Sequence, residues 1–589
     1  MAAASRPTPT NPKPADFGPN VHIFDPSMPM ADITSTIAPI FQSQDTNQFG
    51  PGRQAYFFKP GSYNLSVDVG YYMTVHGLGH SPNDVKITGG VQSLATSTQG
   101  LALNSFWRGV ENLSIVPTTN GDISGWAVSQ ATFLRRVHII GGQLFLFDWR
   151  YPTNYSSGGF IADSLIDKQI ISGSQQQFLT RNTTLTKEIE DIPGRQVSWT
   201  LTDVTLSIFS WNGGVWNMVF VGDDQPPSGS WPDQPFTVVE KTPVIREKPY
   251  LIFENDYAVQ VPNVKRGSQG TSWSNVPDSA TTLPISQFYI AKAATDTADS
   301  INDALHQGYH LIFTPGVYHL SRSLEVQYPN TVILGLGMAT LVPDSGTPAM
   351  VVDDVGGVSI SGIIFDAGPI RTSQLLVIGG ASSASDHNAN PTALFDICCR
   401  VGGAAAGSTL NCVTIHSNNV ILDNIWLWRA DHGNPGAVGW TVNAAENGLT
   451  VEGHDVIAYG LFVEHFQKLQ TVWNGNGGQV YMYQSEIPYD PPDQSSWQQP
   501  TGSKGYASYK VGDRVSSHTA KGLGIYCNFN NQVELDNAIE APTGPGIQLN
   551  HLTTQWLDGK PFSAINHIIN GTGDRVYDNG RNLNAKSTT

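Results

Sequence analysis

The chain has 589 residues and a net charge of −17, and only 14% of its residues are charged. This length is too great for one hydrophobic core, so two large domains are expected. The negative charge disfavours nucleic-acid binding, which needs clustered Lys and Arg, and fits a neutral polymer such as a glucan better than a polyanion. No run of 18 apolar residues occurs, so no membrane-spanning helix is expected. With 59 glycines and few charges, the composition predicts a turn-rich β protein rather than a helical bundle.

The start of the chain, residues 1–19, is rich in Ala, Pro and Thr and contains no apolar signal-peptide core. We expect a disordered linker that remains after removal of a signal, and therefore a secreted protein. A first domain is expected over residues 20–243 and a second over residues 244–589. Several prolines between residues 225 and 249 indicate a linker that crosses from one domain to the other.

A duplicated pattern opens both domains. Residues 56–65 (YFFKPGSYNL) lead into 76–80 (HGLGH), and residues 311–320 (LIFTPGVYHL) lead into 334–338 (LGLGM). Each copy reads as an apolar strand, a Pro-Gly turn, a second strand and a Gly-x-Gly corner. Internal repeats of this kind are typical of coiled parallel sheets. Two copies therefore predict two coils in tandem, with a groove between them.

Short apolar runs recur at intervals of about one coil turn throughout both domains. They are four to eight residues long, β-branched or aromatic, and bounded by Gly, Asn or Ser, as residues 133–140 and 425–428 illustrate. One helix is expected over residues 296–307, where it would cover the open end of the second coil. Residues 380–407, rich in Ala, Gly and Ser, are expected to form a surface excursion. The predicted fold class is all-β, with two parallel β-helix domains joined side by side.

Two glutamates in the second domain form the principal candidate site. Glu464 and Glu486 each end an apolar run and lie 22 residues apart, about one turn of a parallel coil. Residues one turn apart stack on neighbouring strands, roughly 4.7–4.9 Å apart. Two carboxylates so close raise the pKa of one of them, which then stays protonated and can donate a proton to a glycosidic oxygen. The alternative is that both are solvated surface residues.

The four cysteines leave two interpretations open. Cys412 could form a disulfide with Cys398 or Cys399, or all four, Cys527 included, could be buried free thiols. Their spacing does not suggest a zinc site. We expect neither a metal nor another cofactor.

Four blocks of the second domain resemble the family-55 glycoside hydrolases. They are residues 425–432 (IWLWRADH), 448–452 (GLTVE), 459–465 (YGLFVEH) and 484–489 (QSEIPY), and the resemblance extends to residues 173–182 in the first domain. It implies two joined right-handed parallel β-helices and an exo-acting β-1,3-glucanase that inverts the anomeric centre. The implied partner is a polysaccharide or oligosaccharide, and the protein is expected to be a monomer.

The resemblance also implies roles for individual residues. Glu486 matches the general acid, Glu464 the glutamate beside it, and Gln176 or Gln177 a residue that holds the attacking water. Inverting enzymes need carboxyl groups about 6.5–9.5 Å apart, more than the stacking distance allows. Glu464 is therefore expected to tune or orient Glu486 rather than to act as the base. Asp431 and Glu452 are further candidates, although a structural corner residue is an equal interpretation of Asp431.

Aromatic residues near the glutamates are candidates for binding sugar rings, because flat aromatic faces cover the apolar faces of pyranoses. Trp is also a good core filler between two coils, and Trp426 is interpreted in that way. His432 and His465, which flank the carboxylates, are interpreted as structural hydrogen-bonding residues. The candidate substrate-binding aromatics are Trp428, Trp440, Trp473, Tyr489 and Trp497, with Trp211 and Trp216 in the first domain.

Two other functions remain open from the sequence. A polysaccharide lyase would need a basic proton acceptor and a cation for a uronate, and only Lys468 supplies a positive charge near Glu486 in the sequence. A non-catalytic carbohydrate-binding β-helix would keep the aromatic residues but would not need two stacked glutamates.

Overall fold

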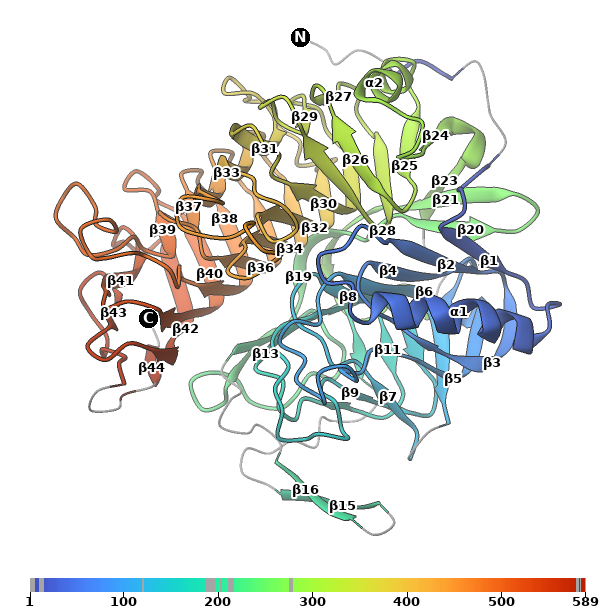
Figure 1. The fold of residues 1–589 in the computed structure, drawn as a ribbon, viewed down its shortest axis with the longest axis horizontal. Helices are drawn as coiled ribbons and strands as arrows, with labels where there is room; N and C mark the ends of the chain where they lie inside the picture. Colours follow the sequence, from blue (N-terminus) through green and yellow to red (C-terminus); the bar gives the residue numbers. More distant parts are fainter. Residues whose placement is uncertain are drawn as a thin grey trace.

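Two coils of parallel β-strands lie side by side in the computed structural model (Figure 1). The structure describes residues 6–9, 15–118, 121–185, 196–201, 204–209, 217–274, 279–578, 582 and 584–587. The first coil, blue to teal, and the second, green to red, meet along one face of each. No described helix is long and apolar enough to cross a membrane.

The main sheet of the first coil is parallel throughout. Its strands pair in the order β1 (Val21–Phe24), β2 (Gln54–Phe58), β4 (Met73–Gly77), β6 (Arg108–Pro117), β8 (Thr132–Ile139), β10 (Phe160–Ala162), β13 (Gln177–Arg181), β17 (Asn217–Val221) and β18 (Phe236–Val239). Joined to it are β3 (Gly61–Asp68), β5 (Val85–Gln92), β11 (Leu165–Ile166) and β14 (Thr184–Leu185), and a smaller sheet contains β7 (Ile123–Gly125), β9 (Gln143–Phe145) and β12 (Ile170–Ile171). Strands β15 (Gln196–Leu201) and β16 (Val204–Phe209) form a separate antiparallel pair.

The second coil has two long sheets. The sheet that faces the first coil contains β24 (Phe288–Ala291), β25 (His310–Phe313), β26 (Val317–Leu320), β28 (Val332–Pro343), β30 (Ser359–Asp366), β32 (Ala393–Val401), β34 (Ile421–Arg429), β36 (Ile457–Glu464), β38 (Gly478–Glu486), β40 (His518–Phe529), β42 (Ile547–Gly559) and the antiparallel β44 (Asn584–Ser587). The other contains β27 (Leu324–Val326), β29 (Met350–Val352), β31 (Thr372–Ile378), β33 (Thr409–Ile415), β35 (Ala445–Val451), β37 (Thr471–Trp473), β39 (Tyr509–Val511), β41 (Glu534–Glu540) and β43 (Ala564–Ile569).

The segment of the chain that connects the first coil to the second forms two small antiparallel sheets. One pairs β19 (Thr242–Arg246) with β22 (Val264–Ser268), and the other contains β20 (Tyr250–Phe253), β21 (Tyr257–Pro262) and β23 (Ala280–Pro284). The expected boundary at residues 243/244 falls inside β19. The expected linker over residues 225–249 is corrected, because β18 adds a further parallel strand to the first coil.

The strands are apolar on both faces because each coil buries its interior and also packs against the other coil. In β34, Ile425 and Leu427 point into the core of the second coil. The alternate residues Trp426 and Trp428 lie between the coils, where Trp107 of the first coil packs against both of them. This double burial explains why the strand runs in the sequence are nearly continuous rather than alternating.

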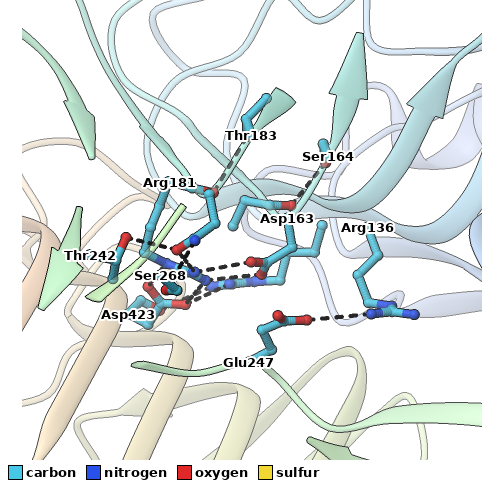
Figure 2. Close-up of polar contacts among 12 residues, drawn as sticks. Arg136, Asp163, Ser164, Arg181, Thr183, Thr242, Glu247, Ser268 and Asp423 are labelled. Carbon is cyan, nitrogen blue, oxygen red and sulfur yellow. Dashed lines mark hydrogen bonds and ion pairs between the residues drawn. The ribbon is translucent and has the colours of Figure 1, made fainter. Parts of the chain in front are cut away.

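A buried ion-pair network, here called the clamp, joins the coils. Arg135 of β8 contacts Asp396 at 2.8 Å and Asp423 at 2.6 Å, and Arg181 of β13 contacts Asp423 and Asp163 at 3.0 Å each. Figure 2 shows Arg181 between Asp163 and Asp423. These side chains are at most 2% exposed. Removal of Arg135 would leave Asp423 with Arg181 alone and Asp396 with Lys248 alone, at 3.3 Å, so the buried charges would be only partly compensated and the contact between the coils weakened.

Two helices cover parts of the coils. Helix α2 (Ala298–His306) begins after Thr297, whose side chain accepts a hydrogen bond from the Ser300 amide, and it lies at the start of the second coil as expected (Figure 1). Helix α1 (Met30–Gln44) packs on β3 and was not expected, because Pro39 and several β-branched residues obscure its pattern. Its buried residues Ile33 and Ile37 are four apart, which places them on one face.

Three further expectations are corrected by the structure. The described part of residues 1–19 contacts the folded protein, since Phe17 is buried and the Arg6 Nε donates to the Gly308 carbonyl. The excursion expected over residues 380–407 contains the buried strand β32. The four cysteines, three of which lie in β32 and β33, are buried free thiols, so the disulfide interpretation is wrong.

Candidate active site

Glu464 and Glu486 stack on neighbouring strands of the second coil, at the ends of β36 and β38. These strands pair in parallel with an offset of 22 residues, and the His465 amide donates to the Glu486 carbonyl at 2.7 Å. The column continues on both sides, because Trp428 pairs with Glu464 and Glu486 pairs with Tyr526. The 22-residue spacing in the sequence therefore corresponds to one turn of the coil.

Both glutamates line a pocket with a volume of about 370 Å³ that lies between the two coils. None of the described residues around it is Lys or Arg. The first coil supplies Leu103, Asn104, Phe106, Gln130, Ser157 and Gln176, and the second supplies Trp428, Asp431, His432, Glu464, His465, Glu486, Tyr489, Asn528, Leu557 and Asp558.

Glu464 is buried, with 3% of its surface exposed. The Gln130 Nε2 of the first coil donates to its Oε1 at 2.9 Å, and the Trp426 Nε1 donates to its Oε2 at 2.9 Å. Burial raises the pKa of Glu464 to about 8, although these hydrogen bonds oppose the shift. Glu464 is therefore protonated at neutral pH.

Glu486 is half-buried and faces the pocket. The Tyr489 hydroxyl donates to its Oε2, and the Gln484 Nε2 lies 3.4 Å from its Oε1. Burial, and then the charges of Glu464 and Asp431, raise the pKa of Glu486 well above its ordinary value. The shift favours the protonated form of this carboxyl group, which remains accessible to a ligand.

Asp431 supplies an ionised carboxylate to the same pocket. The His432 Nδ1 donates to its Oδ1 at 2.9 Å, and the His465 Nε2 lies 3.9 Å away. Burial raises the pKa of Asp431, but the hydrogen bond from His432 and the neighbouring imidazoles outweigh that effect and lower it to about 2. On the other side of His432, the Gln48 amide donates to its Nε2 at 2.7 Å, which links the first coil to this corner.

The two candidate glutamines of the first coil have different positions. Gln176 lines the pocket. Gln177 is fully buried: its Nε2 donates to the Ser157 hydroxyl at 2.9 Å, and its Oε1 accepts from the Tyr526 hydroxyl at 2.8 Å. Gln177 therefore holds Ser157, a pocket residue, rather than reaching the pocket itself.

Four predicted substrate-binding residues do not lie at the pocket, Trp497 among them. Trp473 is fully buried in the core of the second coil, so it presents no face to a sugar. Trp440 packs against that core and the Arg429 guanidinium instead. Glu452 is exposed after β35, on the other sheet, and accepts from the Asn474 amide at 2.9 Å. These residues were predicted from their proximity to the glutamates in the sequence. The prediction fails because successive strands within one turn of the coil belong to different sheets.

Of the other aromatic candidates, Trp428 and Tyr489 line the pocket, whereas Trp497 is buried in the core. Trp211 and Trp216 lie outside the described residues. Trp426, interpreted as core, is buried and also donates a hydrogen bond to Glu464. Its place two residues before Trp428, on the same strand face, is the signal that could have identified it.

Comparisons with known proteins agree with this geometry. The family model described as the LAM55 pectate lyase-like domain matches residues 288–486, a segment that ends at the candidate acid. An exo-beta-1,3-glucanase of Streptomyces sp. (strain SirexAA-E / ActE) is 43% identical over 563 residues, which are 95% of this chain and 87% of that protein. The chain belongs to glycoside hydrolase family 55. These matches confirm the family resemblance and the glycoside hydrolase class that the sequence indicated.

Solved structures confirm the fold. The structure of sacteLam55A from Streptomyces sp. SirexAA-E is 40% identical and superposes with a TM-score of 0.89 over 99% of this chain and 100% of that one. A glutamate-to-alanine variant of sacteLam55A in complex with glucose matches with the same identity, coverage and TM-score. The tandem arrangement of two parallel β-helices is thus confirmed for this family-55 enzyme over nearly its whole length.

Proposed function

We propose that this enzyme releases sugar units from the end of a β-1,3-glucan by inverting hydrolysis, with Glu486 as the general acid. The observation that carries the proposal is the position of Glu486, a carboxyl group with a raised pKa that opens into an interdomain pocket and has no cation beside it among the described lining residues. The names of the relatives support the reaction and linkage, since one is an exo-beta-1,3-glucanase and another was studied with glucose bound.

The acid step needs a proton that is held at neutral pH but released in the transition state. Glu486 fits because burial and the charges of Glu464 and Asp431 raise its pKa, while the pocket gives a glycosidic oxygen access to it. The Tyr489 hydroxyl donates to one carboxyl oxygen and so fixes the orientation of the group. Protonation of the leaving oxygen by Glu486 would break the bond between the terminal sugar and the rest of the chain.

The water that attacks the anomeric carbon must approach from the opposite face of the sugar. Glu464 stacks directly beside Glu486, and its role in this proposal is to raise the pKa of Glu486 through the negative charge that Glu464 carries once it has lost its own proton. Gln176 and Ser157 of the first coil are the pocket groups available to hold the water, and the ionised carboxylate of Asp431 is the group available to accept the proton that the water loses as it attacks. Gln176 and Ser157 belong to the first-coil wall of the pocket, whereas Asp431 shares the second-coil wall with Glu486.

A neutral substrate fits the pocket better than a uronate. A lyase must neutralise a sugar carboxylate, usually with Arg, Lys or a metal ion, and no Lys or Arg lines this pocket among the described residues. Trp428 and Tyr489 instead offer aromatic surface of the kind that packs on pyranose rings.

We also infer that the enzyme works outside the cell, where polymeric glucans are accessible. Assay of the culture medium and of the washed cells of the producing organism tests this inference. Activity confined to the cells would contradict it.

Incubation with a panel of neutral glucans, followed by sizing of the products and determination of their anomeric configuration, tests the proposal. We expect single sugar units of inverted configuration from β-1,3-glucan alone. The variant Glu486→Gln should lose about 10²–10⁴-fold in kcat while its thermal unfolding is unchanged. The matched control is Glu452→Gln, an exposed glutamate of the same coil that should keep full activity. A fully active Glu486→Gln enzyme, or an unsaturated product, would overturn the proposal.

A further inference from the structure

A second cavity, with a volume of about 480 Å³, lies where three parts of the chain meet. It is formed by the segment 6–9, by β19 and its neighbouring hairpin, and by the first turns of the second coil. It shares no residue with the active-site pocket. We call it the arginine pocket and define it by Arg6, Arg246, His310, Asn330 and Asn390.

The charge of the arginine pocket is unusual for this chain. Two guanidinium groups face it, and none of the described residues that line it is Asp or Glu, although the chain has 49 acidic residues and only 32 basic ones. Glu247 follows Arg246 directly but points elsewhere, since its carboxylate is held by Arg136 (Figure 2) and by Lys265. Neither Arg6 nor Arg246 makes an ion pair with any residue that the structure describes.

Both guanidinium groups keep one nitrogen without a partner. In Arg246, which is 7% exposed, one terminal nitrogen donates to the Gly357 carbonyl at 3.1 Å and the other to the Asn390 Oδ1 at 2.6 Å, whereas Nε has no acceptor. In Arg6, Nε donates to the Gly308 carbonyl at 2.7 Å, whereas Nη2 is buried without an acceptor.

An asparagine pair brings the two arginines into one cluster. The Arg6 Nη1 lies 3.4 Å from the Asn330 carbonyl, the Asn390 amide donates to the Asn330 Oδ1 at 2.9 Å, and Arg246 donates to Asn390. Unpaired N–H groups on two cations in one cavity are the donor set that an oxyanion satisfies.

We propose that the arginine pocket binds an oxyanion, either a free inorganic anion or the acidic group of a sugar. Burial lowers the pKa of Arg6 to about 10 and also lowers that of Arg246, and no described carboxylate opposes either shift. An anion would supply a compensating charge and accept from the orphaned nitrogens. The volume is within the range of small-ligand pockets, so it has room for a sugar ring that carries the anionic group.

Binding would stabilise the folded enzyme, because the three parts that form the site are brought together only in the native state. It would tie the segment 6–9 to β19 and to the second coil without contact with the catalytic pocket. The proposal is thus independent of the reaction proposed above, and either can fail alone.

The test is thermal unfolding of the full chain with added phosphate, sulfate, glucuronate or neutral glucose, with ionic strength held constant by sodium chloride. For at least one of the three anions, we expect a saturable rise of roughly 2–4 °C in Tm when the anion concentration is about a hundred times its Kd. Glucose should cause no rise. A stronger response to glucuronate than to phosphate identifies an acidic sugar as the ligand, and the reverse order identifies an inorganic anion.

Two variants and one control complete the test. Arg246→Gln and Arg6→Gln should each weaken anion binding about tenfold or more, because each removes a charged donor. Arg266→Gln, an exposed arginine on the neighbouring strand β22, makes the same change in net charge and should bind as the wild type does. If Arg246→Gln does not fold, the anion binding of Arg6→Gln alone tests the proposal. Absence of a saturable response in the wild type, or an equal response in the Arg6 variant, overturns the proposal.

Discussion

Two pairs of carboxyl groups on the second coil face the first coil, and they have opposite surroundings. In the clamp, Asp396 and Asp423 lie on β32 and β34 and are held by Arg135 and Arg181. In the pocket, Glu464 and Glu486 lie on β36 and β38, and none of the described lining residues is a cation. One pair joins the domains, whereas the other has raised pKa values.

The different surroundings of the two carboxyl pairs come from two turns of the first coil, each of which supplies one arginine and one glutamine. Arg135 and Gln130 are five residues apart around the start of β8, and Arg181 and Gln176 are five apart around β13. In each case the arginine reaches the clamp and the glutamine reaches the pocket. A charged donor keeps a buried carboxylate ionised, whereas a neutral amide hydrogen-bonds to it without cancelling its charge. The choice of Arg or Gln thus separates structural from chemical carboxyl groups.

The largest effect is expected from breaking the clamp. Arg135→Met removes a partner of both Asp396 and Asp423, which keep only Lys248 and Arg181 respectively, so the free energy of unfolding should fall by about 3–5 kcal/mol. Urea denaturation measures it, and the exposed Arg266→Met serves as the control, with a change within about 0.5 kcal/mol. A loss below about 1 kcal/mol for Arg135→Met would mean that the clamp does not hold the coils together.

Giving the pocket a cation should convert its carboxyl pair into a clamp-like pair. Gln130→Arg places a guanidinium beside Glu464, which favours ionisation of both glutamates and should lower kcat at neutral pH about 10²-fold or more. Gln130→Met, of similar size and without charge, separates this effect from the loss of the hydrogen bond. Equal activity of the two variants would show that charge is not what distinguishes the regions.

The pH profile should reflect the coupling between the two glutamates. A general acid acts when protonated, so kcat/KM should fall as pH rises through the raised pKa of Glu486, well above the ordinary range of a glutamic acid. Glu464→Gln removes a charge that raises this pKa, so the alkaline limb should move to lower pH by about one unit. An unmoved limb would contradict the coupling.

The smallest expected effect concerns stability. The pKa of Glu464 is about 8 in the folded protein, above its value in an unfolded chain, so the native state binds the proton more tightly. The stability of the wild type should therefore decrease as pH rises from about 4.5 to 8. Relative to Glu464→Gln, the wild type should lose at least about 1 kcal/mol between pH 5 and pH 9. A difference that is constant with pH would show that Glu464 is not protonated when folded.

Much of the architecture could be predicted because the turns of a coil produce a periodic pattern in the amino-acid sequence. The repeated Pro-Gly openings correspond to β2–β3 and β25–β26, and the spacing of Glu464 and Glu486 equals one turn. Helix α1 was missed because its stability comes from packing on β3 rather than from its own residues.

Apart from Gln176, which the family resemblance indicated, the first-coil half of the site could not be predicted, since contacts such as Gln130 with Glu464 join residues 334 positions apart. The positions of Trp473 and Glu452 failed for the same reason: the sequence gives distance along the chain, not which sheet of the coil a side chain belongs to.

Difference infrared spectroscopy of the wild type and Glu486→Gln at neutral pH tests the central claim most directly. The account predicts the carbonyl band of a protonated carboxylic acid in the wild type, absent from the variant and converted to a carboxylate band only at alkaline pH. A carboxylate band for Glu486 already at pH 6 would contradict it.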